Sequence, residues 1–329
     1  MTTLAESATV APAATPLARL HAFLRRRPAT FAAVLALVML AVNIAMQPSF
    51  GPVQQLAAFA PIALAAMAMA VTIIGGGVDL SISPQMTLSS ILLVGYLTPA
   101  GLGGYIALPI LLVAGAAVGA LNGIVVVCLR LPPIVVTLAS MFVLTGVNLR
   151  LAPKPVVLFD GWVLDLARTV WVLPGGLITV AVPLALWYLL MRTAYGRNLY
   201  AAGGNDATAY SAGVPVAVVR VLSYALGGVL AALGGIALTA LVSSVDATSS
   251  GSYTIGAIAA VALGGISLAG GRGGMLGALA GAAVIFLVQN MLTIFNVSQV
   301  WLNLVFGALL LFAVVMGAVI AAPGKEKRR

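Results

Sequence analysis

Long apolar runs recur along the whole chain, and they constrain its fold more than any other feature. A helix needs about 20 mostly apolar residues to cross the hydrocarbon core of a bilayer. Runs of this kind cover residues 31–46, 56–74, 84–97, 106–127, 134–149, 170–191, 216–241, 253–268, 275–294 and 300–321. The first and third are short, so each is open to being tilted, broken or re-entrant. The sequence predicts an all-α membrane protein, a polytopic helical bundle of about ten transmembrane helices in a single domain over residues 1–329.

Composition excludes several other classes of protein. The chain is 62% apolar and 7% charged, whereas soluble domains are about 45–50% apolar and about 25% charged. Disorder requires the opposite composition. The single cysteine, Cys128, cannot form an internal disulfide, and the only histidine, His21, lies near the N-terminus. Histidine metal sites and catalytic triads are therefore excluded, and we expect no metal, no cofactor and no enzymatic activity.

The charge pattern indicates a membrane rather than nucleic acid as the partner. The formal net charge is +9, but the lysines and arginines lie in short gaps between apolar runs, as in polytopic membrane proteins. No P-loop pattern occurs in the sequence, so any ATP must bind another chain.

The basic residues also predict the orientation. Lysine and arginine are enriched on the cytoplasmic side, and basic clusters both precede the first run and follow the last. We therefore expect cytoplasmic tails at residues 1–28 and 322–329 and an even number of spans. Ten spans place Arg130, Arg192, Arg197 and Arg272 in the cytoplasm and the mixed-charge segment 150–168 outside.

A glycine-rich interruption follows the second run. Gly75, Gly76 and Gly77 are expected to end one helix, and Ser83 followed by Pro84 reads as the N-cap and first residue of the next. Ser81 and an acid, Asp79, lie between them. Asp79 either caps the amides of the following helix or takes part in a transport pathway or gate, because acids within a membrane are commonly functional.

A second interruption contains Gly264, Gly265 and Ser267. Polar side chains within the apolar runs, Asn122 and Thr137 among them, are candidates to line a pathway for a polar solute, or are interhelical hydrogen bonds. Glycines also recur every four residues, at 115, 119 and 123 and at 273, 277 and 281. Such ridges serve helix packing within the chain or a contact between subunits.

The longest cytoplasmic interval between runs is predicted to cover residues 192–215. Its small residues suit a short helix with Asn205 or Asp206 as N-cap. The interval is either a docking surface or a plain connector. The residues that we expect to carry docking are Gly196, Arg197, Gly203, Gly204, Asn205, Ala207, Ala209 and Gly213.

Four segments together resemble the membrane permeases of bacterial ABC sugar importers of the ribose, xylose, arabinose and galactose type. Residues 76–81 resemble the family's Gly-Gly-Ile-Asp-Leu-Ser segment, and residues 131–138 its Leu-Pro-Pro-Phe-Ile-x-Thr-Leu segment. Residues 196–205 resemble its Gly-Arg-x-x-x-Ala-x-Gly-Gly-Asn loop, and residues 263–273 its Leu-Gly-Gly-x-Ser-Leu-x-Gly-Gly-x-Gly segment. The segments occur in one order over residues 56–296.

The resemblance implies a fold like that of type II ABC importers in the bacterial inner membrane. It implies a dimer of two permease subunits, a separate ATPase docked on the loop after the sixth span, and a periplasmic binding protein that delivers a monosaccharide or similar small polyol. Two departures stand out. Ser83 and Pro84 replace a usual glycine, and the family's Ala-Ala-Arg run after the loop asparagine is absent, which puts a salt bridge from that arginine in doubt.

An ion-coupled secondary transporter of a small polar solute is the alternative function. That mechanism usually needs acids, histidines or cation-coordinating breaks within the membrane. Asp79 is the main acidic candidate for it here.

Overall fold

The computed structural model describes residues 29–47, 50–158, 161–170, 172–298 and 300–321. Both predicted tails, 1–28 and 322–329, lie outside these residues. The helices are α2 (Ala29–Met46), α3 (Pro52–Ile74), α4 (Ile82–Leu92), α5 (Gly104–Leu129), α6 (Pro133–Leu151), α7 (Gly175–Met191), α8 (Ala194–Gly204), α9 (Asp206–Ser211), α10 (Val216–Val242), α11 (Tyr253–Leu263), α12 (Met275–Ile294) and α13 (Val300–Ala321). A π-helical turn, η1 (Leu93–Leu97), extends α4.

Each predicted apolar run contains a helix. Six helices of the described chain, α2, α3, α5, α6, α10 and α12, are long and apolar enough to cross a membrane by length and composition. The bent pair α7 and α8, which meet at 85°, adds a seventh if it counts as one span. The prediction of a polytopic helical membrane protein is confirmed, and a total of about ten spans stays a prediction.

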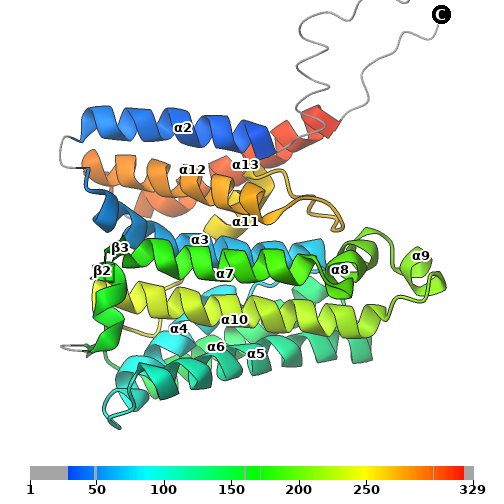
Figure 1. Ribbon diagram of the computed structural model, residues 1–329, viewed down its shortest axis with the longest axis horizontal. Coiled ribbons are helices and arrows are strands. Elements are labelled where there is room, and N and C mark those ends of the chain that lie inside the picture. The colour runs from blue at the N-terminus through cyan, green and yellow to red at the C-terminus, as the bar shows by residue number, and fades with distance from the viewer. Residues whose placement is uncertain (1–28, 48–49, 159–160, 171, 299, 322–329) are drawn as a thin grey trace, which may run out of the picture.

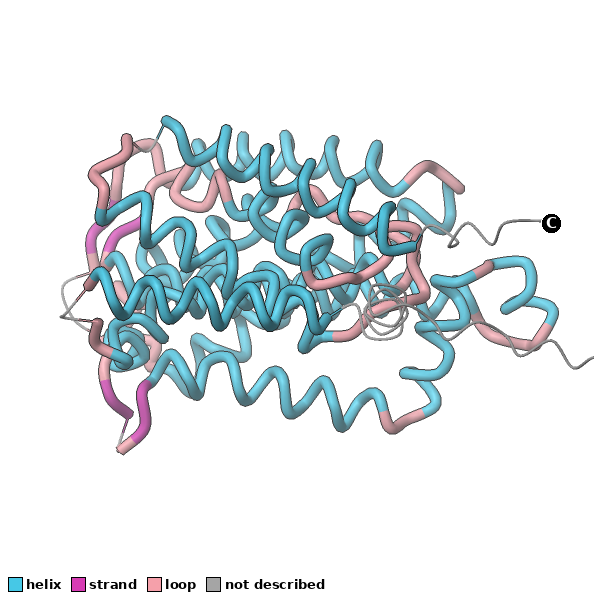
Figure 2. Tube along the Cα trace, turned by 90° about the horizontal axis from the view of Figure 1, so that it is seen from above, coloured by secondary structure: helices cyan, strands magenta, loops and turns pink. Residues whose placement is uncertain are grey.

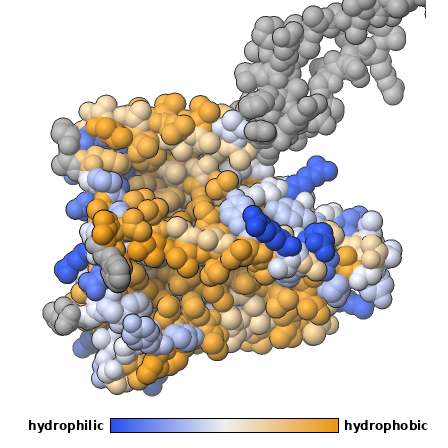
Figure 3. Space-filling model, in the orientation of Figure 1, coloured by the Kyte–Doolittle hydropathy of each residue, from blue (hydrophilic) through white to orange (hydrophobic). Residues whose placement is uncertain are grey.

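The long helices, α2, α7, α10 and α12 among them, lie with nearly parallel axes (Figure 1). Apolar side chains cover the middle of the visible face, and hydrophilic residues gather at its two ends (Figure 3). The α8–α9 segment projects from one end, whereas β2 (Thr169–Val170) and β3 (Leu173–Pro174) lie at the other. This distribution is the one expected of a bundle whose middle contacts lipid.

The end away from α8 carries structure that the sequence did not indicate. A 3-10 helix, η2 (Trp162–Ala167), precedes the antiparallel pair β2 and β3. A second antiparallel pair joins β1 (Val156–Val157) to β4 (Ser244–Val245). These short strands appear at one end of the tube view (Figure 2). The β1–β4 pair ties the loop after α6 to the loop after α10.

The centre of the bundle is α3. Every residue from 60 to 74 is buried, and the helix packs against α7, α10, α11 and α12. A helix that is apolar on all sides belongs in such a position, and its many alanines allow close approach of neighbouring backbones. By contrast, α6 packs mainly on α4 and α5 and leaves most of its surface exposed.

The glycine ridges pack within the chain. A methyl group at Gly119 of α5 would overlap the carbonyl oxygen of Tyr224 in α10, and one at Gly281 of α12 would overlap that of Ala260 in α11. The two helix pairs therefore approach backbone to backbone. Of the two interpretations of these ridges, packing within the chain is the correct one.

Candidate functional site

The first break, residues 75–81, connects α3 to α4. Gly76 has a left-handed φ of +86°, which glycine adopts without steric cost. The amide of Gly76 donates to Ile73 O at 2.9 Å, and that of Gly77 donates to Thr72 O at 2.9 Å. These bonds satisfy carbonyl groups that the end of α3 would otherwise leave free. The prediction that these glycines end a helix is confirmed.

The predicted start of the next helix is wrong by two residues. Helix α4 begins at Ile82 with Ser81 as its N-cap, rather than at Pro84 with Ser83 as its N-cap. Pro84 is tolerated because it lies in the first turn, where amides have no partner within the helix and a missing N–H leaves no bond unmade.

Asp79 is fully buried in the first break. Its Oδ1 accepts a hydrogen bond from the Ser81 amide at 2.8 Å and another from the Ser81 hydroxyl at 2.5 Å. Its Oδ2 accepts a longer bond, 3.4 Å, from Gln85 Nε2. The contact with the Ser81 amide is a local turn of the kind that short acidic side chains form. Asp79 thus holds the entry to α4, which agrees with the capping interpretation.

Side chains from two further helices bind the first break. Ser81 Oγ accepts bonds from Gln85 Nε2 at 2.7 Å and from Asn122 Nδ2 of α5 at 2.9 Å. The Thr137 hydroxyl of α6 donates to the carbonyl oxygen of Val78 at 3.1 Å. The candidate pathway residues Asn122 and Thr137 therefore both lie against the break. Gln85, which the sequence analysis did not single out, joins Asp79 and Ser81 in what we call the Asp79 cluster (Asp79, Ser81, Gln85 and Asn122).

As an N-cap, Ser83 would accept bonds from amides of α4, but it bonds to α11 instead. Its hydroxyl accepts from the Thr254 amide of α11 at 2.7 Å, and its own amide donates to Thr254 Oγ1 at 3.1 Å. The Ser250 hydroxyl donates to Ser83 O and shares a hydrogen bond with the Thr87 hydroxyl. These bonds join the beginnings of α4 and α11.

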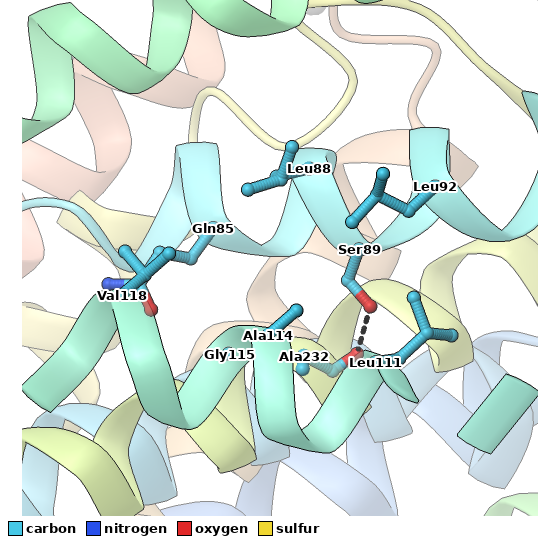
Figure 4. A pocket seen from close by; sticks show the side chains of 9 residues that line it. All are labelled: Gln85, Leu88, Ser89, Leu92, Leu111, Ala114, Gly115, Val118 and Ala232. Carbon is cyan, nitrogen blue, oxygen red and sulfur yellow. Dashed lines mark hydrogen bonds between the residues drawn. The ribbon is translucent and has the colours of Figure 1, made fainter. Parts of the chain in front are cut away.

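A small cavity lies beside the Asp79 cluster, between α4, α5 and α10. Gln85, Ser89, Gly115 and Ala232 are among its lining residues, and Figure 4 shows the amide oxygen of Gln85 directed toward α5. Gln85 Oε1 is buried and has no partner among the described residues. The space is about the size of one water molecule, and most of its lining is apolar. The cluster thus has an unused acceptor beside a small, mostly apolar cavity.

The second break, residues 264–274, follows α11. Gly264 packs against Gly277 of α12, and Gly265 has a φ of +73°. Ser267 lies in the following turn, where its amide donates to Arg272 O at 3.1 Å. Among the described residues, Ser267 is not part of the Asp79 cluster. The structure thus separates the candidate gate residues into two groups.

Both breaks meet the end of α8 at a glycine junction. A methyl group at Gly76 would lie 3.3 Å from Gly203 Cα, and one at Gly271 would lie 2.5 Å from the nitrogen of Gly204. The Gly271 amide donates to Ile74 O at 3.1 Å. The other glycine of the junction is Gly270, where a methyl group would lie 2.5 Å from Gly203 O. Three motifs far apart in sequence are therefore in backbone contact.

The α8–α9 segment, residues 192–215, contains the expected short helix as α9 and also α8, which the sequence did not predict. Asn205 is the N-cap of α9, because its Oδ1 accepts from the Thr208 amide at 2.9 Å. Arg197 and Gly204 are exposed, whereas Gly196 and Gly203 are buried. Gly213 turns the chain toward α10 with a φ of +80°.

The two candidate alanines of α9 differ in environment. Ala207 is exposed, whereas Ala209 is only 4% exposed. Ala207 can therefore contact a partner, and Ala209 holds α9 on the bundle. Tyr210, which no sequence pattern singles out, is 77% exposed on the same short helix.

Tyr200 fixes α8 to the second break, since its hydroxyl donates to Gly273 O at 2.9 Å. Burial, and secondly the neighbouring Tyr188, raise the pKa of Tyr200 above its ordinary value. The hydroxyl therefore keeps the proton that it donates.

A salt bridge does form at this segment, although the family's arginine is absent. Arg220 Nη2 of α10 lies 2.6 Å from Asp206 Oδ1 of α9. The signal that could have identified Arg220 is its position inside an apolar run, since a charge there is costly unless it is paired.

Comparisons with known proteins show the family to which the chain belongs. Residues 51–314 match the family described as "Branched-chain amino acid transport system / permease component". The ribose import permease protein RbsC of Escherichia coli (strain K12) is 34% identical over 263 residues, which are 77% of this chain and 81% of that protein. RbsC of Bacillus subtilis (strain 168) is 35% identical over 258 residues, 77% and 80% of the two chains.

The fructose import permease protein FrcC of Rhizobium meliloti is 32% identical over 261 residues, 76% of this chain and 72% of that protein. No solved structure matches the chain. The match over most of its length, together with its apolar helices, shows that this chain belongs to the family of ABC importer permease components and is a transport subunit rather than an enzyme.

Proposed function

We propose that this chain is the membrane permease of an importer for a monosaccharide or a similar small polyol. Similar proteins import ribose and fructose, and permeases of this family work with a separate ATPase and a binding protein. The observation that carries the proposal is the glycine junction, where both helix breaks contact the end of α8. Because α8 contacts both breaks, a movement of α8 can be transmitted directly to each of them.

The α8–α9 segment is the proposed ATPase-docking surface. It projects from one end of the bundle (Figure 1), and α9 exposes Ala207 and Tyr210. Aromatic side chains commonly anchor protein interfaces. We assign Gly196, Arg197, Gly203, Gly204, Asn205 and Gly213 to shaping this segment and Ala209 to seating α9 on the bundle.

The gate is proposed to lie at the first break. Residues Gly76, Gly77, Asp79 and Ser81 connect two helices there, and hydrogen bonds from Asn122 and Thr137 hold the connection. Ser83, in the first turn of α4, belongs to the same proposed gate. Because the polar groups of the Asp79 cluster bond to one another and Asp79 is fully buried, a sugar hydroxyl can reach them only after the break moves. Gly264, Gly265 and Ser267 are assigned to the second moving part.

The assembly is proposed to be a homodimer in the bacterial inner membrane with both termini in the cytoplasm. The basic clusters at the two ends of the sequence support this orientation. So does the position of β2 at the end opposite α8 and α9, since β2 directly follows the mixed-charge segment 150–168 that is expected outside.

Reconstitution tests this proposal. The permease, its ATPase and its binding protein are placed in liposomes, and uptake of labelled ribose, fructose, xylose and an amino acid such as leucine is compared. We expect one sugar to accumulate in a manner that depends on the binding protein. Accumulation of leucine and of none of the sugars would contradict the proposed substrate class.

A further inference from the structure

One face of α10 packs against three consecutive glycines of the first break. The contacting side chains recur at the i, i+3 and i+4 spacing that places residues on one side of a helix. A methyl group at Gly75 would lie 2.8 Å from a side-chain oxygen of α10, and one at Gly76 would lie 3.1 Å from a guanidinium nitrogen. The pairs are Gly75 with Ser223, Gly76 with Arg220 and Gly77 with Tyr224.

Arg220 contacts the α8–α9 segment at the same time. Its Nη2 lies 2.6 Å from Asp206 Oδ1, and Asp206 is the first residue of α9. The Arg220 side chain is 23% exposed and that of Asp206 is 51% exposed. One guanidinium group thus lies between α9 and Gly76.

We propose that Arg220 is a positioning residue that transmits movement of α9 to the first break, with Asp206 as its attachment on α9. The inference rests on the proposed function, in which α8–α9 docks the ATPase. A half-exposed ion pair contributes little to stability, so stability alone does not account for an arginine inside an apolar helix. A guanidinium group has five N–H donors in a rigid plane. It can keep its ion pair with Asp206 while its remaining donors move with the first break.

Arg220 also has an unused donor for a second arrangement. Its Nε is buried and has no acceptor among the described residues. A shift of α9 that draws the guanidinium along α10 can bring this donor to a backbone carbonyl oxygen of the break. Coupling between the docking surface and the first break requires an element with two discrete arrangements. Both sites must influence which arrangement that element adopts.

The test uses the complete complex of permease, ATPase and binding protein in liposomes. Asp206→Asn and Arg220→Gln each remove the ion pair from one side. We expect both variants to retain the ATPase and to hydrolyse ATP, while the sugar imported per ATP hydrolysed falls about tenfold, a typical coupling effect. Asp206→Glu keeps the carboxylate and is expected to keep the wild-type ratio.

Two matched controls lie outside the docking surface. Asp165→Asn removes an exposed carboxylate and Arg168→Gln removes an exposed arginine, both in the segment before β2. Both are expected to leave the ratio of import to hydrolysis unchanged. If Arg220→Gln reduces the yield of folded protein, Asp206→Asn on the exposed side still decides the question.

The outcomes separate this inference from the proposed function. If Asp206→Asn releases the ATPase, Asp206 is a docking contact, and the inference fails while the proposed docking stands. An unchanged ratio in both variants also overturns the inference. If instead Ala207→Lys leaves ATPase binding and import normal, docking on α9 itself is wrong.

Discussion

Ser83 and Thr254 are hydrogen-bonded to each other in both directions. The Ser83 amide donates to Thr254 Oγ1 at 3.1 Å, and the Thr254 amide donates to Ser83 Oγ at 2.7 Å. Each residue lies in the first turn of its helix, α4 or α11, where amides have no acceptor within the helix. Each side chain therefore caps the start of the other helix. These bonds hold the first turns of α4 and α11 against each other.

Removing one hydroxyl of this pair should destabilise the fold. Thr254→Val keeps the shape of the side chain but leaves the Ser83 amide without its acceptor. We expect the free energy of unfolding to fall by about 1–3 kcal/mol, seen as a lower unfolding temperature of the protein in detergent. Thr254→Ser is the control that keeps the hydroxyl. Equal unfolding temperatures for the two variants would show that the reciprocal bonds contribute nothing.

Glycine substitutions test the backbone contact between α5 and α10. Gly119→Ala places a methyl group against the carbonyl oxygen of Tyr224, and overpacking of this kind costs about 1–3 kcal/mol. The matched control is Gly146→Ala on α6, because no atom lies within 4 Å of the added methyl group. Thermal unfolding should be lowered only by the first change. A destabilised Gly146→Ala variant with a normal Gly119→Ala variant would reverse the assignment of the packed face.

Asp79 should tolerate asparagine better than leucine. In Asp79→Asn the remaining oxygen still accepts from the Ser81 amide, and Gln85 can rotate its amide so that the free Oε1 meets the new donor. Asp79→Leu leaves the Ser81 amide and hydroxyl without their acceptor, at about 1–3 kcal/mol for each buried group, while Gln85 keeps its bond to Ser81 Oγ. Sugar uptake and the amount of folded protein are measured together. Loss of uptake in a well-folded Asp79→Asn variant would mean that the charge itself is required.

Docking of the ATPase should depend on the exposed side of α9. Ala207→Lys and Tyr210→Ala alter exposed positions, so both should insert and fold normally while the ATPase no longer co-purifies. Ala209→Lys differs because Ala209 is buried, and it should reduce folded protein as well. Normal ATPase retention in both exposed variants would make α9 a connector.

The sequence predicted the bundle because each spanning helix requires its own long apolar run. The start of α4 was misplaced because Pro84 is acceptable at several positions of a first turn. Glycines at 76, 203 and 271 could be identified singly as helix ends. The contact among these three glycines could not be predicted, because it depends on how three distant segments pack.

The partners of polar residues inside apolar runs are a second feature that could not be predicted from the sequence. Arg220 and Thr254 each lie in a run that predicts a span, and their partners are on other helices. Gln85 also lies in such a run, but it bonds to the break that precedes its own helix. Asn122 and Thr137 were identified as candidates, but only the structure places both against the first break. Their roles in transport stay predictions.

The source of energy tests the central claim most directly. Liposomes containing the permease and its ATPase are supplied with binding protein, labelled sugar and ATP, and uptake is measured with and without ionophores that remove ion gradients. We predict that uptake requires the ATPase and ATP hydrolysis and is unchanged by the ionophores. Uptake by the permease alone that an ion gradient drives and an ionophore abolishes would contradict the account and establish the ion-coupled alternative.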